Sequence, residues 1–264
     1  MKLAFSTLGC PEWTLEYALQ QAYDLGFQGL EIRGIQNQMR ADTIDELCGE
    51  KREISLKNAR KKGIVLCALD ASASFHEKEK QEENTEEAII TVKKAAECGI
   101  PLVRIFGNNL PDADKDAQIK DIAGCVRRVC EAASPLGVQV LLEVHGDFNT
   151  SKRLLQTADA VGCENFGILW DIQHSNATQD CAEFWAETQE LIRHVHIKDS
   201  KDGALCSVGQ GTLPIERIVN MMTRDGYDGF FSLEWEKRWH PELQDAATEF
   251  PSYVAYMNKI LQKG

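Results

Sequence analysis

Residues 134–145 read SPLGVQVLLEVH, and this stretch decides the fold. A helical pattern ends before Gly137, the residue type that most often supplies the left-handed conformation at a helix end. The apolar run that follows predicts a buried strand over 138–143. This strand closes on Glu143, and His145 comes two residues later. The same order of helix, glycine and apolar strand recurs at Gly26, Gly63, Gly99 and Gly226.

Eight units of this kind fill the chain. We predict strands over 2–7, 28–33, 64–69, 102–106, 138–143, 166–171, 194–198 and 229–234. We predict helices over 14–25, 43–62, 81–98, 117–134, 151–161, 181–192, 214–224 and 247–262. Strict alternation of strand and helix indicates an α/β protein with a parallel sheet. Eight units in 264 residues favour a single-domain (β/α)8 TIM barrel over 1–264, with an open doubly wound sheet as the alternative.

Composition narrows the classes of partner and compartment. The chain has 29 Lys and Arg against 41 Asp and Glu, a net charge of −12, which argues against nucleic acid and against an anionic membrane as partners. Its 9 cysteines form no C-x-x-C pair and are typical of reduced thiols. The first residues lack the apolar core of a signal peptide, and no stretch approaches the roughly 18 apolar residues of a membrane span. We therefore expect a cytoplasmic protein, with monomer or homo-oligomer left undetermined.

Polar side chains end four consecutive predicted strands, at the edge where TIM barrels carry their chemistry. These ends read LLEVH (141–145), LWDIQH (169–174), HVHIKD (194–199) and SLEW (232–235). Glu143, Asp171, His196 and Glu234 can all point into the barrel, because side chains alternate along a strand. Three unpaired carboxylates in one place would repel each other, and a divalent cation would remove that repulsion. Three oxygen ligands and one imidazole suit one Mn²⁺, Mg²⁺, Co²⁺ or Zn²⁺ ion.

Further residues are expected near the same mouth. His145 keeps the face of Glu143, and it could line the pocket or simply be a loop histidine. Lys198 keeps the face of His196, where it could hold an anionic group of the substrate or pair with Asp199 or Glu236. Trp13 could stack on a sugar ring, or it could simply cap the first helix.

Two arginines in short strands, Arg33 and Arg104, would need partners if they point inward. Glu31 shares a face with Arg33 and is its expected partner. Either arginine could belong to a structural network, and Arg104 is also a candidate for substrate binding. The loop Gly209-Gln210-Gly211 suggests a phosphate cradle, although the sequence has no G-x-G-x-x-G or P-loop motif.

The strand ends identify a family resemblance. The chain resembles the xylose-isomerase-like TIM barrels, a family that includes D-tagatose 3-epimerase, hydroxypyruvate isomerase, inosose enzymes, 3-dehydroshikimate dehydratase and endonuclease IV. The likeness covers essentially the whole chain and is strengthened by STLGCPEW (6–13), GLEIR (29–33) and VRIFG (103–107). It implies a single-metal site of Glu143, Asp171, His196 and Glu234, in that order. It also implies that His174 binds substrate, as in the epimerases, or is a further metal ligand, as in endonuclease IV.

The chain departs from the family pattern at several positions. The epimerases carry a substrate-binding Glu where this chain has Asn149, and an Arg where it has Asp202, which argues against ketohexose-type specificity. Endonuclease IV needs an Asp-x-His after the seventh strand, and this chain has none, so its three-zinc site cannot be completed.

The sequence therefore predicts a metal-dependent isomerase or epimerase of a sugar, keto-sugar or related polyhydroxylated carbonyl compound. Glu143 and Glu234 are expected to transfer the proton through a metal-bound ene-diolate. A metal-dependent lyase or dehydratase on a sugar-derived or cyclitol substrate is the alternative. A sugar-binding barrel without activity also stays open, and a nuclease is the least favoured class.

Overall fold

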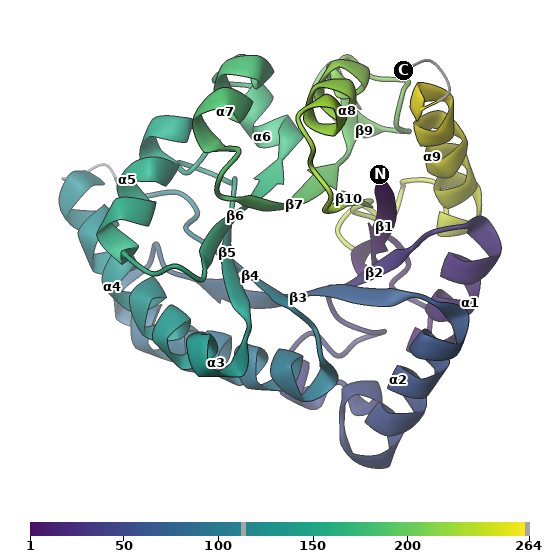
Figure 1. Ribbon diagram of the computed structural model, residues 1–264, viewed down its shortest axis with the longest axis horizontal. Coiled ribbons are helices and arrows are strands. Elements are labelled where there is room, and N and C mark those ends of the chain that lie inside the picture. Colours follow the sequence, from purple (N-terminus) through teal and green to yellow (C-terminus); the bar gives the residue numbers. More distant parts are fainter. Residues whose placement is uncertain (112–114, 262–264) are drawn as a thin grey trace.

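Parallel strands close into a barrel in the computed structural model, which describes residues 1–111 and 115–261. The barrel strands are β1 (Lys2–Ser6), β2 (Gly29–Ile32), β3 (Val65–Ser74), β4 (Leu102–Phe106), β5 (Gln139–Glu143), β6 (Phe166–Asp171), β7 (Ile192–Ile197) and β10 (Phe230–Leu233). They run in the order β1-β10-β7-β6-β5-β4-β3-β2, and β1 pairs with β2 to close the ring. The TIM-barrel prediction is therefore confirmed, and the open doubly wound sheet is excluded (Figure 1).

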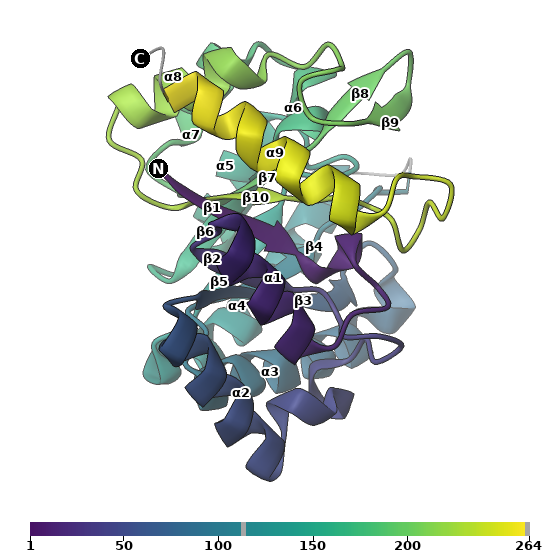
Figure 2. The ribbon, with the colours of Figure 1, turned by 90° about the vertical axis from the view of Figure 1, so that its right-hand side faces the viewer.

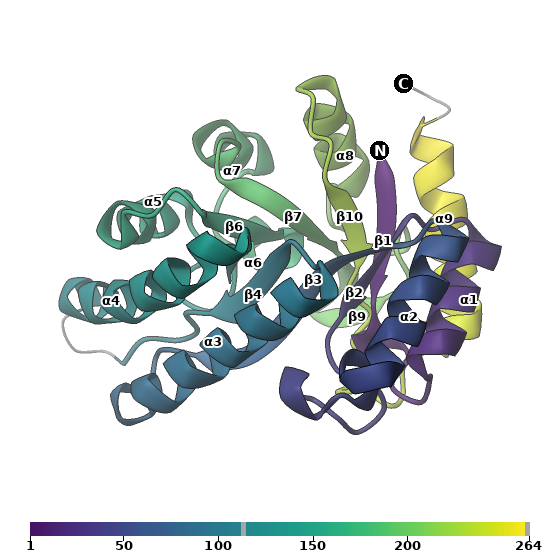
Figure 3. The ribbon, with the colours of Figure 1, turned by 60° about the horizontal axis from the view of Figure 1, so that its bottom comes forward.

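Helices surround the barrel, as Figures 1 and 3 show. They are α1 (Leu15–Leu25), α2 (Gly49–Lys62), α3 (Gln81–Cys98), α4 (Lys115–Ala133), α5 (Ser151–Val161), α6 (Ile172–Asn176), α7 (Cys181–Thr188), α8 (Ile215–Arg224) and α9 (Ala246–Leu261). Short 3-10 turns occur at Thr7–Gly9, Ala41–Thr43, Asp45–Leu47, Lys78–Lys80 and Ser134–Leu136. A hairpin of β8 (Asp199–Lys201) and β9 (Ala204–Cys206) projects from the barrel beside α6 (Figure 2). Within the described ranges, no helix is both long enough and apolar enough to cross a membrane.

Most predicted bounds agree with the structure to within two residues, and the exceptions have physical causes. The helix predicted over 43–62 begins only at Gly49, after two 3-10 turns. The helix predicted over 181–192 ends at Thr188, because Ile192 pairs with Ile168 and already belongs to β7. β3 continues to Ser74, five residues beyond its predicted end. The last residue of the helix predicted over 247–262, residue 262, lies outside the described part of the chain.

The chain positions its site by alternation along the strands. Leu141 and Leu169 point into the barrel and form a small apolar cluster there with Ala68 and Leu102. Glu143 and Asp171 follow two residues later on the same strands, so they take the same inward face one layer higher. A larger apolar core fills the space between the barrel and the helices. The carboxylates of Glu143 and Asp171 therefore lie above an apolar layer, at the carboxyl end of the barrel.

Candidate metal centre

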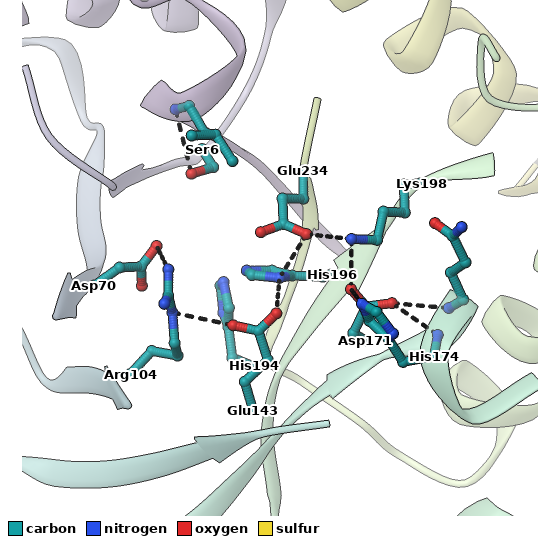
Figure 4. A network of polar contacts seen from close by, with 12 residues as sticks. Ser6, Asp70, Arg104, Glu143, Asp171, His174, His194, His196, Lys198 and Glu234 are labelled. Atoms are coloured by element: carbon teal, nitrogen blue, oxygen red, sulfur yellow. Dashed lines mark hydrogen bonds and ion pairs between the residues drawn. The ribbon is translucent and has the colours of Figure 1, made fainter. Parts of the chain in front are cut away.

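The four predicted ligands converge at the mouth of the barrel. Glu143 ends β5, Asp171 ends β6, His196 lies in β7, and Glu234 directly follows β10. Each offers one ligand atom, and these atoms all lie within 4.8 Å of one another (Figure 4). All four residues are buried. Strand order explains this convergence, since β5, β6, β7 and β10 are consecutive neighbours in the barrel.

His196 stands between the carboxylates. Its Nδ1 lies 3.5 Å from Oε1 of Glu143 and 3.3 Å from Oε2 of Glu234, without hydrogen-bond geometry to any described residue. Its Nε2 lies 2.9 Å from Oε1 of Glu31. Burial opposes charge on the ring, but the carboxylates of Glu234 and Glu31 raise the pKa of His196 well above its usual range. Burial likewise opposes charge on Glu234, yet His196 and Lys198 lower the pKa of Glu234 well below its usual range.

Glu31 is not the partner of Arg33, and that prediction was wrong. Glu31 points into the barrel and shares its two oxygens between His196 and His194, whose Nε2 lies 2.5 Å from Oε2. Arg33 instead donates to Oγ of Ser72 at 3.1 Å. The two histidines lie on the inward face of β7 and contact Glu31 across the barrel. Glu31 therefore pairs with them and not with Arg33, which is only two residues away in the sequence.

Lys198 contacts the carboxylates at the mouth of the barrel. Its Nζ lies 2.7 Å from Oδ2 of Asp171 and from Oε2 of Glu234 (Figure 4). It also lies 2.7 Å from Oε1 of Glu236. The predicted pairing with Glu236 is therefore present. Burial opposes the charge, but these three carboxylates raise the pKa of Lys198 well above its usual range. The ammonium group is charged at neutral pH and bridges two of the predicted metal ligands.

Arg104 contacts two carboxylates on the side of the centre opposite Lys198. Its guanidinium lies 3.1 Å from Oε2 of Glu143 and 3.2 Å from Oδ2 of Asp70, and it stacks over the ring of Phe106. The side chain is fully buried. Its position allows it to orient and neutralise Glu143 from behind.

His145 and His174 form the polar wall beside the centre. Their rings lie 4.4 Å apart in an edge arrangement, and Nε2 of His174 lies 3.9 Å from Oδ2 of Asp171. Burial, followed by repulsion from His174, lowers the pKa of His145, so this imidazole is neutral at pH 7. Both rings face a cavity of about 670 Å³ that amides and hydroxyls line, with Asn109, Asn149, Gln173, Asn176, Ser200 and Thr212 among the lining residues.

The loop Gly209-Gln210-Gly211 is occupied by an anion of the protein itself. Backbone N–H groups of Gly209 and Gly211 both donate to Oδ2 of Asp199 at 2.9 Å. Those of Ser200 and Leu213 donate to Oδ1 of the same carboxylate. A Cβ at Gly211 would collide with the carboxylate of Asp199, so the loop closes tightly on this side chain. These N–H groups therefore do not offer a phosphate cradle.

Trp13 is not among the residues that line the cavity beside the four predicted ligands. Its ring packs against Phe5, Tyr17 and Phe250, between α1 and α9. It lines a second cavity of about 700 Å³, together with Trp239 and Arg238. None of the described residues lining this second cavity is one of the four predicted ligands or a lining residue of the first cavity.

The donor set fits a divalent cation. Nδ1 of His196 is buried, lacks a hydrogen-bond partner among the described residues and faces two carboxylates. Its Nε2 is held by a carboxylate, the arrangement that commonly orients a metal-binding histidine. Three carboxylates with one imidazole are a suitable ligand set for Mn²⁺, Mg²⁺, Co²⁺ or Zn²⁺.

Sequence reasoning missed several residues of this site. The contact of Asp70 with Arg104 and the histidine-bridging role of Glu31 depend on pairs of strands, and the amides of the cavity come from two loops and from α6. Alternation along β2 could have shown that Glu31 points inward, two residues before Arg33. No local sequence pattern shows that the two ring nitrogens facing Glu31 belong to histidines of β7.

Comparisons with known proteins show which family the chain belongs to. A sequence model described as "Xylose isomerase-like TIM barrel" matches residues 19–253. An uncharacterized protein of Methanocaldococcus jannaschii is 29% identical over 145 residues, 51% of this chain and 48% of that protein. A ketose 3-epimerase of Arthrobacter globiformis is 32% identical over 119 residues, 43% of this chain and 40% of the epimerase. The chain thus matches less than half the length of each of these two relatives.

Solved structures share the fold over nearly the full length. The probable 3-DHS dehydratase AsbF of Bacillus anthracis has a TM-score of 0.83 at 19% identity, covering 98% of this chain and 99% of that one. IOLI protein, solved with a zinc atom, has a TM-score of 0.82 at 17% identity, covering 100% and 99%. D-psicose 3-epimerase of Clostridium cellulolyticum H10, solved with D-tagatose, has a TM-score of 0.80 at 18% identity, covering 99% of each chain. With its closed barrel and the family match over residues 19–253, the chain belongs to the xylose isomerase-like TIM barrel family.

Proposed function

We propose that the protein is a divalent-metal-dependent isomerase or epimerase of a sugar, keto-sugar or related polyhydroxylated carbonyl compound. The observation that carries this proposal is the position of Glu143 and Glu234, which face Nδ1 of His196 from two separate strands. Two carboxylates flanking one centre can serve two positions of a substrate, one that loses a proton and one that gains it.

The ion would be held by Glu143, Asp171, His196 and Glu234. When bound, it supplies positive charge that polarises a carbonyl group and acidifies the neighbouring C–H bond. The protein's own charges prepare the carboxylates for their part. Lys198 contacts Glu234, and Arg104 contacts Glu143, so each carboxylate has a cation at its back. Lys198 favours the ionised form of Glu234, which can accept a proton from carbon.

Glu234 and Glu143 then act as base and acid on the substrate. One carboxylate removes the proton next to the carbonyl carbon. The other returns a proton to the adjacent carbon, which gives an isomer, or to the opposite face of the same carbon, which gives an epimer. Proton transfer by a placed carboxylate contributes about 10²–10⁴-fold to the rate.

The cavity beside the centre favours a polyhydroxylated substrate. Its amide and hydroxyl lining offers both donors and acceptors to sugar hydroxyls, and about 670 Å³ is enough for a small sugar. The ketose 3-epimerase relative and the psicose 3-epimerase solved with D-tagatose act on or bind compounds of this class. Asn149 lines the cavity where the epimerases that the chain resembles carry Glu, so the preferred sugar need not be a ketohexose.

Proton exchange with solvent tests this function directly. The protein, loaded in turn with Mn²⁺, Mg²⁺, Co²⁺ and Zn²⁺, is incubated in D₂O with ketohexoses, ketopentoses, sugar phosphates and 3-keto-glucosides, and each sugar is examined by NMR. We expect metal-dependent deuterium uptake at a carbon next to the carbonyl of at least one sugar, together with its isomer or epimer. Conversion that is unaffected by full removal of the metal would contradict the proposal.

A metal-dependent lyase is the second candidate, and His145 supports it. This neutral imidazole faces the cavity beside the metal centre, where it could accept a proton from the substrate. The fold is also that of the probable 3-DHS dehydratase. A lyase would expel a substituent and create a double bond, so ultraviolet absorbance of the product distinguishes the two reactions.

A further inference from the structure

Glu31 bridges the two histidines of β7 inside the barrel. Its Oε1 lies 2.9 Å from Nε2 of His196, and its Oε2 lies 2.5 Å from Nε2 of His194. All three side chains are fully buried. The contact with His196 has the length of a hydrogen bond to a charged acceptor, and the contact with His194 is shorter. An ionised carboxylate only accepts hydrogen bonds, so the ring N–H is the donor in both contacts.

These three residues do not form a second metal site of their own, although their ligand atoms lie close together. Two ligands of one tetrahedral ion, each about 2.1 Å from it, must stand more than about 3 Å apart. The contacts of 2.5 and 2.9 Å are shorter than that spacing. Glu31 is therefore a hydrogen-bond acceptor that holds both rings.

The bond to Nε2 decides which nitrogen of His196 is available to a cation. An imidazole that binds a metal keeps one N–H and offers the lone pair of the other nitrogen. If the proton stays on Nε2, against Glu31, then Nδ1 carries the lone pair. Nδ1 is the nitrogen that faces Glu143 and Glu234.

We propose that Glu31 is a positioning residue of the metal centre: it keeps the proton on Nε2 of His196 and thereby directs Nδ1 toward the ion. It does not touch the ion or the substrate. His194 holds the second oxygen of Glu31 and so fixes the carboxylate in the plane that His196 requires. This inference rests on the metal centre of the proposed function, but it does not depend on which reaction the centre catalyses.

Metal affinity tests the proposal without any assay of turnover. Zn²⁺ and Mn²⁺ dissociation constants are measured by competition with a chelator for the wild type, Glu31→Gln and Glu249→Gln. In Glu31→Gln the amide oxygen can still accept from one ring, but the amide nitrogen opposes the N–H of the other. Removal of a carboxylate that orients a metal-bound histidine typically weakens binding about 10–100-fold, and we expect that loss for Glu31→Gln.

Glu249→Gln is the matched control. Glu249 is also a fully buried carboxylate, but it lies on α9 and accepts from the backbone N–H of Val208. Its variant should bind both ions like the wild type. Equal affinity of Glu31→Gln and the wild type would overturn the role of Glu31 alone. No ion bound by the wild type would overturn the proposed metal-dependent function as well, so the two failures are distinguishable.

A spectroscopic measurement on the wild type covers the case in which Glu31→Gln fails to fold. In the Zn²⁺-loaded protein with ¹⁵N-labelled histidine, we expect Nε2 of His196 to carry a slowly exchanging proton and Nδ1 to carry none. A merely structural Glu31 would not require this pattern. A Zn²⁺-bound Nε2 with the proton on Nδ1 would overturn the proposal.

Discussion

Nζ of Lys198 lies 2.7 Å from Oε2 of Glu234, the same oxygen that faces Nδ1 of His196 at 3.3 Å. The ammonium group also lies 2.7 Å from Oδ2 of Asp171. A resident cation therefore contacts two of the four ligands expected to hold the metal. It balances part of their negative charge before an ion arrives, and it must share their oxygens once the ion is bound.

Replacement of this cation should tighten metal binding. Lys198→Met keeps the approximate length of the side chain but removes the charge that repels the ion. At such a short distance, two unit charges interact by several kcal/mol at most. We expect Zn²⁺ affinity to rise by about tenfold or more, and the melting temperature of the metal-free protein to fall. Lys201→Met, at an exposed position of β8, is the matched control and should change neither. Weaker metal binding by Lys198→Met would show that the ammonium group supports the centre.

Loss of a ligand should release the ion. His196→Ala removes the only imidazole of the ligand cluster, and Asp171→Asn replaces a charged oxygen by a neutral amide. We expect elemental analysis to find about one divalent ion per wild-type chain and far less in either variant. His240→Ala, at a half-exposed histidine outside this cluster, should keep its metal. Full metal content in both ligand variants would mean that the ligands are wrongly assigned.

Asp199 should control the order of the loop that follows β9. Its carboxylate accepts four backbone N–H groups, and that loop places Thr212 in the wall of the cavity. Asp199→Asn keeps the shape, but it removes the charge and turns one acceptor into a donor. We expect hydrogen exchange at Gly209, Gly211 and Leu213 to accelerate by at least tenfold, since each lost charged hydrogen bond is worth about 1.5–3 kcal/mol. Metal content should stay unchanged, and unaltered exchange at all three amides would refute this role.

Asp147 should give the protein part of its stability above pH 4. It accepts from the N–H of Leu110 at 2.7 Å and pairs with Lys115, and these contacts lower the pKa of its carboxyl against the opposing effect of burial. A lowered native pKa stabilises the fold above the unfolded value, and this contribution is lost as the pH falls through the native value. Asp147→Asn should therefore melt lower than the wild type at pH 7, and the difference should shrink toward pH 3. A difference that grows on acidification would contradict the assignment.

The sequence was enough to predict the barrel and the convergence of four candidate ligands at its mouth. Helix-ending glycines and apolar strands recur along the chain, and alternation within each strand shows that Glu143, Asp171 and His196 can face inward. All three, with Glu234, meet within 4.8 Å in the structure. These features are local, so the periodicity of a single sequence carries them.

Contacts between strands distant in the sequence could not be predicted in the same way. Glu31 was expected to pair with Arg33, yet it reaches His194 and His196, more than 160 residues later. That choice depends on the closure of the barrel, which brings β2 and β7 to face each other across its interior. The hairpin β8–β9 was also missed, because it is short and Asp199 organises the loop that follows it.

Glu143 and Glu234 are the proposed proton-transfer pair, and their replacement by glutamine separates this role from metal binding. Glutamine keeps the size of glutamate and one oxygen donor, but it removes the base. The decisive measurement is therefore deuterium uptake from D₂O into a converted sugar by the wild type, Glu143→Gln and Glu234→Gln, with metal content determined on the same samples. We predict that Glu234→Gln still binds some metal and loses exchange per bound ion by about 10²–10⁴-fold, with a comparable loss for Glu143→Gln. Exchange at the wild-type rate in both metal-loaded variants would contradict this assignment and would shift the search for the base to His145 and Lys198.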